Sequence, residues 1–301
     1  MLKNLGITVV VVEYTRDAPR IIASSSKVSL SSKQVEDILS ISEEEVETWI
    51  KETFRRSHFS PWEHASYTFI IDGLSRVASH QLVRHRIASY TQLSHRYSEG
   101  YLRKMVLQAS TIAEIKCPEK PKEDKRSAYA CYAKALEKTI ESENKLEIAL
   151  IGYVPPPLKP EDLNRWATQM LKLTGEYYGM LAGGVKREDA RYILPHSLRT
   201  RIVVTMNARE LMQSFLPLRM CTRAQWEIRY IAWSLWRELM KIHPQLFKYA
   251  GPSCIFRENT TRWWPEPLED YLEGRAEFTI PRCPELVENK TIRKCLLTAS
   301  L

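Results

Sequence analysis

Residues 84–98 carry the side chains best suited to chemistry, because they combine arginines with neutral hydrogen-bonding groups. Arg84, Arg86 and Arg96, with Arg76 just before them, supply planar guanidinium forks, and Ser94 supplies a small hydroxyl. Forks and hydroxyls of this kind can together satisfy the oxygens of a phosphate. No Asp or Glu occurs from residue 75 to residue 98. The stretch therefore predicts an anion-binding loop, with a solvated basic surface stripe as the alternative.

The spacing of these residues makes a prediction about direction. In extended backbone, side chains two residues apart lie on the same side. Arg84 would then share a side with Arg86, and Ser94 with Arg96. His85 and His95 would face away from the arginines.

Several short segments are expected to position this loop. The pattern of Leu74, Val77 and Leu82 predicts a short amphipathic helix from Leu74 to about Val83, which would deliver Gln81 and Arg84. β-Branched and aromatic runs predict strands at residues 7–12, 67–71 and 202–205, with a turn at Asp72-Gly73.

The remaining helices are predicted from caps and apolar periodicity. A capping box at Ser42–Glu45 predicts a helix that runs to about Arg56. Further helices are expected from residue 160 to about Gly175, and at 186–193, 208–215 and 225–242. Ser24–Ser26 and the serines after them are expected to form a loop, and residues 97–105 to be extended.

These elements predict an α+β fold, with a mainly antiparallel sheet flanked by helices. Residues 1–250 would form one catalytic domain with a helical insertion at about 107–160. Residues 251–301 show no clear period and are expected to be an irregular C-terminal extension.

Composition narrows the class of protein. The chain has 301 residues, a formal charge of +8 and a pI near 9.1, which favours anionic partners. Its six cysteines form no CxxC pair, so a reducing cytoplasm is the expected location. The longest apolar runs are too short to cross a bilayer, so we expect no membrane partner.

Two other kinds of site are disfavoured. His58, Glu63 and His64 lie close together, but their spacing is not a standard zinc pattern and no third ligand is near. We therefore expect no metal site. The chain also lacks a glycine-rich dinucleotide fingerprint and a Walker loop, so a nucleotide or flavin would have to be held by side chains.

The motif Arg-His-Arg, seven residues, Ser, one residue, Arg resembles the signature of flavin-dependent thymidylate synthases. Matching stretches at His58–His64 and from Asn207 through Arg219 follow in the order that this family requires. The resemblance implies reductive methylation of dUMP to dTMP, with methylenetetrahydrofolate and NADPH or NADH as co-substrates and FAD as cofactor. It also implies a homotetramer with sites between subunits.

The resemblance assigns roles to individual residues. It places the nucleotide at Gln81, Arg84, Gln92, Ser94, Arg96, Arg191 and Arg219. It places the flavin at His58, Ser60, Glu63, Arg84, His85, Arg86, Ile87, Gln92, Asn207 and Arg209. Arg219, expected beside the pyrimidine, is the catalytic candidate.

The chain departs from the family pattern at two points. Thr91 and Gln92 stand where the family commonly has Asn and Glu, so an expected carboxylate is an amide here. Residues 212–219 are one residue longer than usual, so no role is assigned to Gln213 or Ser214.

Two other functions remain as alternatives. A basic nucleic-acid-binding protein is supported by the net charge and by 14 tyrosines available for stacking. A metal hydrolase would use His58, Glu63 and His64. We do not expect nucleic acid to be a partner of the enzyme.

Overall fold

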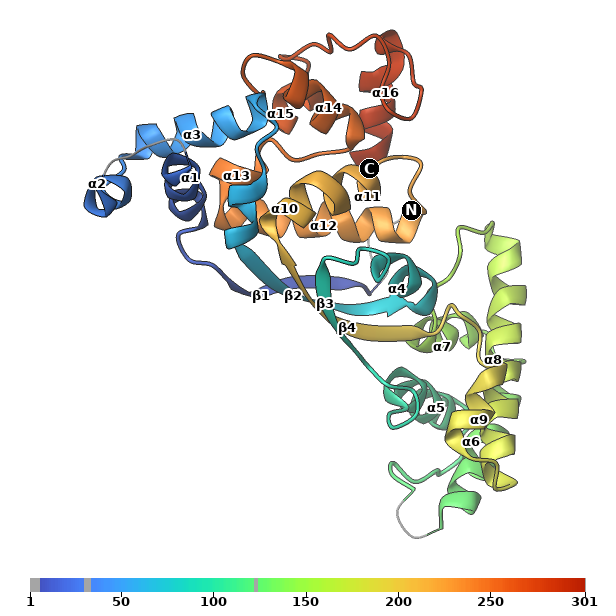
Figure 1. Ribbon diagram of the computed structural model, residues 1–301. Coiled ribbons are helices and arrows are strands. Elements are labelled where there is room, and N and C mark those ends of the chain that lie inside the picture. The colour runs from blue at the N-terminus through green and yellow to red at the C-terminus, as the bar shows by residue number, and fades with distance from the viewer. Residues whose placement is uncertain (1–5, 30–33, 122–123, 301) are drawn as a thin grey trace. The chain divides into compact units, whose positions relative to one another are not determined.

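A computed structural model describes residues 6–29, 34–121 and 124–300 (Figure 1). It contains a four-stranded sheet in the order β1-β2-β4-β3, with β1 and β2 antiparallel. The strands are β1 (Thr8–Tyr14), β2 (Ser66–Ser75), β3 (Ala88–Gln92) and β4 (Arg199–Asn207). The α+β class and the three predicted strands are confirmed.

The chain divides into two compact units. Unit 1 comprises residues 1–6, 73–80 and 92–202, and unit 2 comprises residues 7–72, 81–91 and 203–301. The divisions fall within β2, within α4 (Arg76–Leu82), near the end of β3 and within β4. Each unit is therefore described by itself.

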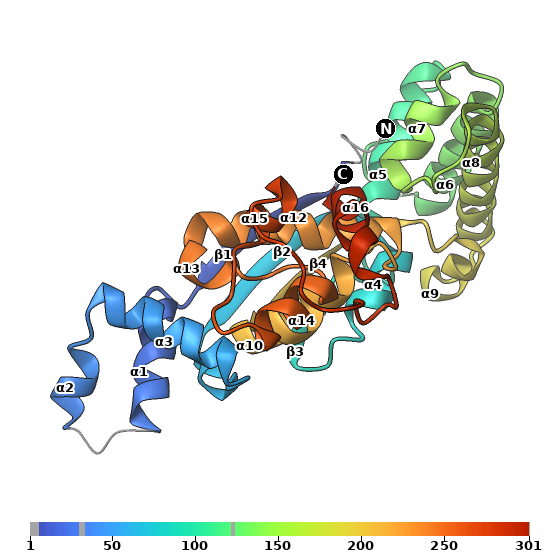
Figure 2. The same cartoon turned by 90° about the horizontal axis from the view of Figure 1, so that it is seen from above.

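Unit 1 is mainly a helical bundle, in which α6 and α8 pack along each other and α5 and α7 complete the core (Figures 1 and 2). Its helices after α4 are α5 (Gly100–Ile112), α6 (Lys125–Thr139), α7 (Lys145–Gly152), α8 (Pro160–Ala182), α9 (Arg187–Ala190) and the 3₁₀ turn η2 (Arg191–Ile193). Tyr132, Tyr153 and Tyr178 are buried in this core.

Two predictions in unit 1 are wrong. Residues 97–105 are not extended, because α5 begins at Gly100 and buries Leu102, Met105 and Val106. Helix α8 does not end at Gly175 but continues to Ala182. An interior glycine costs a helix only about 1 kcal/mol, which the burial of Leu171 and Tyr178 offsets.

Unit 1 also holds a disulfide between Cys117 and Cys131. The spacing of the cysteines did not predict this pairing, which joins the segment after α5 to helix α6. The other four cysteines are unpaired.

Unit 2 contains the remaining helices. Between β1 and β2 they are α1 (Ala18–Val28), α2 (Val35–Leu39), α3 (Glu43–Arg55) and the 3₁₀ turn η1 (Ser60–His64). After β4 they are α10 (Ala208–Glu210), the π-helix η3 (Leu211–Phe215), α11 (Leu216–Arg219), α12 (Trp226–Ile242), α13 (Pro244–Phe247), α14 (Ser253–Thr261), α15 (Leu268–Glu273) and α16 (Asn289–Ser300).

Helix α12 is the core helix that the sequence predicts. It contacts β1 and buries Ile228, Ile231 and Leu235 on one face (Figure 1). The capping box of α3 is also confirmed, because the Glu45 N–H donates to Ser42 Oγ and the Ser42 N–H donates to the Glu45 carboxylate.

The predicted loop at Ser24–Ser26 is wrong, because these residues lie inside α1. Tertiary burial of Ile22 and Ala23 outweighs the weak helix propensity of serine. The Ser26 hydroxyl donates to the Ile22 carbonyl at 2.8 Å, so it is satisfied within the helix. Ser31 and Ser32, which were included in the predicted loop, lie outside the described residues.

The predicted turn at Asp72-Gly73 is also wrong, because β2 continues to Ser75. Gly73 has a φ of +82°, and a Cβ at this position would lie 2.2 Å from the Gly6 carbonyl oxygen. The Gly73 carbonyl accepts a hydrogen bond of 2.6 Å from Arg199 Nη1. Gly73 therefore permits a local irregularity within the strand, and the chain does not reverse its direction there.

No helix within the described ranges is long and apolar enough to cross a membrane.

The C-terminal extension is not irregular throughout, because it contains α14, α15 and α16. Glu258, a fully buried residue of α14, connects this helix to residues 279 and 280. The Glu258 carboxylate accepts hydrogen bonds from the Thr279 N–H and hydroxyl and from the Ile280 N–H, and it pairs with Arg262 at 2.9 Å. Burial alone would raise the pKa of Glu258, but these donors together lower it below its ordinary value.

We predict that Glu258→Gln lowers the free energy of unfolding by about 2–3 kcal/mol at neutral pH, because an amide cannot replace a charged acceptor of three donors. The folded carboxylate has the lower pKa, so its contribution is complete above the unfolded pKa and is lost as the pH falls through the folded value. Denaturant titrations at neutral and acidic pH measure this. Glu269→Gln, at an exposed position on α15, is the matched control. An equal deficit at both pH values would contradict the prediction.

Candidate functional site

The Arg-His-Arg part of the motif lies in unit 2 and forms a turn between α4 and β3. The prediction of extended backbone is wrong here. The Tyr90 hydroxyl bridges the carbonyls of Leu82 and His85, at 2.9 and 2.6 Å, and so closes the turn. Arg84, Arg86 and Ile87 are exposed. Neither arginine pairs with a carboxylate within the described part of the chain.

His85 is buried, with 4% of its surface exposed. It connects Glu210 to Arg219, the catalytic candidate. Its Nδ1 lies 3.0 Å from Glu210 Oε1 and 3.1 Å from Ser214 Oγ. On the other side of the ring, Arg219 Nε donates to His85 Nε2 at 3.0 Å. Arg219 Nη2 donates to the Gln81 carbonyl at 3.1 Å. The turn and helix α11 are thus joined through one imidazole.

This geometry fixes the tautomer of His85. Because Nε2 accepts from Arg219, the proton of the neutral ring lies on Nδ1, which donates to Glu210. Burial lowers the pKa of His85, and this effect outweighs the Glu210 hydrogen bond, which favours the protonated form. His85 is therefore neutral at pH 7 and holds Arg219 without adding a second positive charge.

The sequence did not predict this network. Residues 75–98 contain no acid, so there was no reason to expect a carboxylate beside His85. Glu210, far along the chain, supplies it. One local signal existed: Asn207 lies three residues before Glu210, at the spacing of a helix cap. The Asn207 side chain does cap α10, because it accepts from the Glu210 N–H at 2.8 Å.

A second group of flavin candidates lies at the start of η1 and along α10. Glu63 and Arg209 form an ion pair at the surface, and Arg209 Nε also donates to Gln213 Oε1 at 2.7 Å. Ser60 is exposed, and the His58 side chain is half-buried. The structure therefore brings Glu63 and Arg209 together.

A π-helix occurs in the segment that we expect to be one residue longer than usual. Leu211–Phe215 form a π-helix between α10 and α11. A π-helix widens one turn and so accommodates an additional residue within a continuous helix. Ser214 lies in this turn and contacts His85.

The Ser-x-Arg part of the motif lies in unit 1 and is a turn, not an extended segment. The N–H groups of Tyr97 and Ser98 both donate to the Ser94 carbonyl, and the Arg96 N–H lies 3.3 Å from Ser94 Oγ. Arg96 pairs with Glu188 at 3.2 Å, with both side chains nearly half exposed. The neighbouring Gln92 donates to the Thr200 hydroxyl at 3.3 Å.

A cationic pocket of about 300 Å³ lies beside this turn, within unit 1. Its walls carry two arginines and three histidines and no acid: Arg76, Arg191, His80, His95 and His196. The rings of His80 and His196 lie 5.4 Å apart.

Charge is unbalanced in this cationic pocket. The Nε2 atom of His95 is buried without a hydrogen-bond partner. Burial, then Arg76 and Arg191, lower the pKa of His95 to about 4. His95 therefore faces two cations, Arg76 and Arg191. Its direction relative to the Ser94 and Arg96 pair stays a prediction. Sequence reasoning identified Arg191 and named Arg76 as a cationic fork. It gave no binding role to the three histidines, since they come from separate segments.

No group of three or more His, Cys, Asp or Glu in the described ranges is arranged to hold a metal ion. His58, Glu63 and His64, considered in the sequence as a metal site, are not such a group.

The role of Glu210 can be tested through the pKa of His85. In Glu210→Gln the attraction that favours protonated His85 is lost, while burial and Arg219 continue to oppose protonation. We therefore expect the pKa of His85 to fall further, measured by an NMR titration of the imidazole. Glu188→Gln, in unit 1, is a control that should leave it unchanged. A rise in the His85 pKa on Glu210→Gln would contradict the proposed hydrogen-bonding arrangement.

Comparisons with known proteins identify the family. The family model for thymidylate synthase complementing proteins matches residues 10–245. A flavin-dependent thymidylate synthase from Aeropyrum pernix is 58% identical, over 99% of this chain and 94% of that protein. A relative of the same name from Sulfurisphaera tokodaii is 40% identical over 96% of each chain.

A solved structure shows the same fold. The flavin-dependent thymidylate synthase of Helicobacter pylori, complexed with FAD and dUMP, aligns with a TM-score of 0.58 and 27% identity. The alignment covers 81% of this chain and 99% of that one. Because the family match covers most of the chain and the relatives match it almost end to end, this protein belongs to the family of flavin-dependent thymidylate synthases.

Proposed function

We propose that this protein converts dUMP to dTMP by reductive methylation, with methylenetetrahydrofolate as carbon donor, NADPH or NADH as reductant and FAD as cofactor. The observation that carries the proposal is the 58% identity over 99% of the chain to a relative named for this activity. The Helicobacter pylori relative, whose structure holds FAD and dUMP, supports the choice of ligands.

The nucleotide phosphate is assigned to the residues of unit 1. Arg191 and Arg76 line a pocket without acids, and a phosphate dianion would supply the counter-charge that these groups lack. The same charge would raise the pKa of His95 and favour a hydrogen bond from its ring. Ser94 and Arg96 lie on the turn that contributes a hydroxyl and a further guanidinium.

The residues of unit 2 fit a flavin phosphate and ring. Arg84 and Arg86 are exposed cations in a turn, and Glu63 with Arg209 offers both an acceptor and donors. His58, Ser60, Ile87 and Asn207 complete this assignment, with contacts from His85 and Gln92 also expected. When bound, FAD supplies the hydride chemistry, and the protein binds and orients the reactants.

Arg219 is assigned to the pyrimidine. Its Nε is occupied by His85 and its Nη2 by the Gln81 carbonyl, so the guanidinium is held in one orientation. A fixed cation placed near the uracil carbonyls would stabilise negative charge that develops on the ring. The Gln81 side chain remains free to contact the nucleotide in this proposal.

A homotetramer with sites between subunits is part of the proposal. It would place phosphates or flavin from one subunit against the unpaired arginines of another. A cytoplasmic location is likewise proposed from the sequence.

We predict that the purified protein is yellow and releases FAD when denatured, because its chemistry requires a redox cofactor. The absorption spectrum before and after denaturation measures this. A colourless protein that also fails to take up added FAD would contradict the proposal. Binding of single-stranded nucleic acid with steep salt dependence would then favour the alternative.

We predict that Arg96→Ala weakens dUMP binding by roughly 1.5–3 kcal/mol, about 10- to 150-fold in Kd, since a charge-assisted phosphate contact is lost. Calorimetric titration with dUMP and with deoxyuridine separates the phosphate from the base. FAD content should be unchanged. Arg126→Ala, at an exposed position on α6, is the matched control. Equal losses for nucleotide and nucleoside would remove Arg96 from the phosphate site.

We predict that Cys221→Ser retains substantial turnover with folate and NADPH. Burial raises the pKa of the Cys221 thiol, which disfavours the thiolate that nucleophilic attack on the uracil ring would require. Steady-state assays at saturating dUMP measure the effect. Loss of turnover with normal FAD and dUMP binding would identify Cys221 as a nucleophile.

A further inference from the structure

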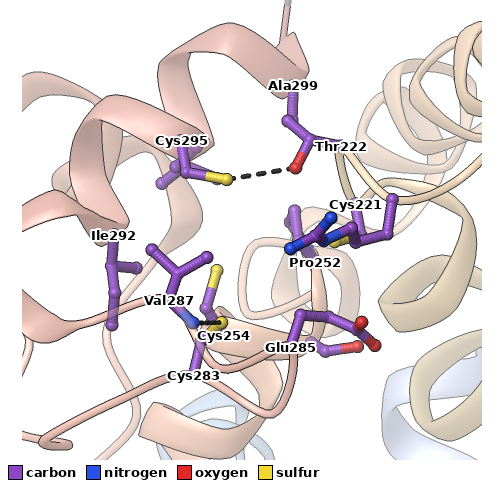
Figure 3. A pocket seen from close by; sticks show the side chains of 13 residues that line it. Cys221, Thr222, Pro252, Cys254, Cys283, Glu285, Val287, Ile292, Cys295 and Ala299 are labelled. Carbon is purple, nitrogen blue, oxygen red and sulfur yellow. Dashed lines mark hydrogen bonds between the residues drawn. The ribbon is translucent and has the colours of Figure 1, made fainter.

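One apolar pocket in unit 2 collects every unpaired cysteine of the chain (Figure 3). Cys221 follows α11, Cys254 lies in α14, Cys283 lies between α15 and α16, and Cys295 lies in α16. Four separate segments between residues 221 and 295 thus bring their thiols to one place. Neither the motif nor the proposed reaction uses these thiols.

This thiol pocket is small and its walls are mostly apolar, with Pro252, Val287, Ile292 and Leu296 among them. Its volume is about 20 Å³, which is room for about one water molecule. Cys283 is buried, and the other three cysteines are partly exposed.

Two of the four thiols are distinguished by their contacts. Cys254 packs against a small apolar cluster that consists of Ile280, Cys283 and Ile292. Cys283 is 7% exposed, and the Val287 N–H donates to its sulfur at 3.4 Å. Figure 3 shows the Cys254 and Cys283 side chains on the same side of the pocket.

Cys295 is engaged differently. Its sulfur lies 3.1 Å from the Thr222 hydroxyl, on the other side of the pocket from Cys283 (Figure 3). The contacts therefore favour Cys254 and Cys283 as the reactive pair over any pair with Cys295.

We propose that Cys254 and Cys283 are a modification site that forms a second disulfide when a low-molecular-weight disulfide is the oxidant. One thiol loses its proton and attacks the oxidant, which releases one small thiol and leaves a mixed disulfide. The other cysteine then attacks the mixed disulfide and releases the second small thiol. The protein loses two electrons and two protons, and the oxidant gains both.

Burial sets the rate of this exchange. It raises the pKa of Cys254, so little thiolate is present at neutral pH and exchange should accelerate as the pH rises. The pair is thus suited to a lasting structural bond more than to rapid signalling.

The bond would restrain helix α14, which supports two parts of the candidate site. The Ser253 hydroxyl donates to the Pro217 carbonyl at 2.9 Å, two residues before Arg219. The rings of Phe256 and Phe59 have centroids 5.7 Å apart. In the sequence, Phe59 lies between the flavin candidates His58 and Ser60. Oxidation should therefore stabilise unit 2. This inference does not depend on the identity of the substrate.

The test uses the full-length protein, incubated at mildly alkaline pH with oxidised glutathione or with dithiothreitol. After acid quenching and alkylation of free thiols, peptide mass spectrometry should find Cys254 linked to Cys283 only in the oxidised sample. A C117S/C131S background isolates the new bond, which should raise the Tm by about 5 °C. Cys254→Ser and, independently, Cys283→Ser should abolish both effects, whereas Cys221→Ser should retain them.

Several results would overturn the proposal. These are a linked peptide that joins Cys221 to Cys295 without the predicted one, glutathione retained on Cys254 or Cys283, or free thiols unchanged by the oxidant. Protection of all four thiols by a co-purifying metal ion, released by a chelator, would also overturn it.

Discussion

Unneutralised positive charge is the constraint on which the candidate site depends. Arg84 and Arg86 in unit 2 are exposed and have no carboxylate partner within the described residues. In unit 1, Arg76 and Arg191 share a pocket with three histidines and no acid. Such an arrangement is unfavourable in an empty site and becomes favourable when an anion is bound. The repulsion between these side chains therefore favours the binding of an anion.

A further cation, Arg219, is oriented without being neutralised. His85 accepts from Arg219 and donates to Glu210, so Arg219 is oriented through a neutral ring and the carboxylate remains one residue removed from the guanidinium. A direct ion pair would hold Arg219 more simply but would neutralise its charge. The imidazole gives orientation while leaving the charge available to a substrate.

The C-terminal extension supports the part of the candidate site in unit 2 through contacts of helix α14. Buried Glu258 organises the chain from α14 to Ile280. Helix α14 contacts both Pro217 of α11 and the ring of Phe59. The thiol pocket lies in the same region. A part of the chain that shows no period in sequence is therefore ordered by one satisfied carboxylate and by local apolar packing.

The sequence by itself determined the strands at residues 7–12, 67–71 and 202–205, the capped helix α3, the core helix α12 and the family motif. Each of these depends on neighbours in the sequence: alternation, periodicity, a cap or a fixed spacing. Only the tertiary structure decided that Ser24–Ser26 are helical, that α8 continues past Gly175 and that Gly73 lies within a strand, since burial outweighs weak local preferences. It also decided that Glu210 meets His85 and that four distant cysteines meet in one pocket. Such contacts join separate segments of the chain. A local sequence pattern cannot predict which distant side chain will complete a hydrogen bond or fill a cavity.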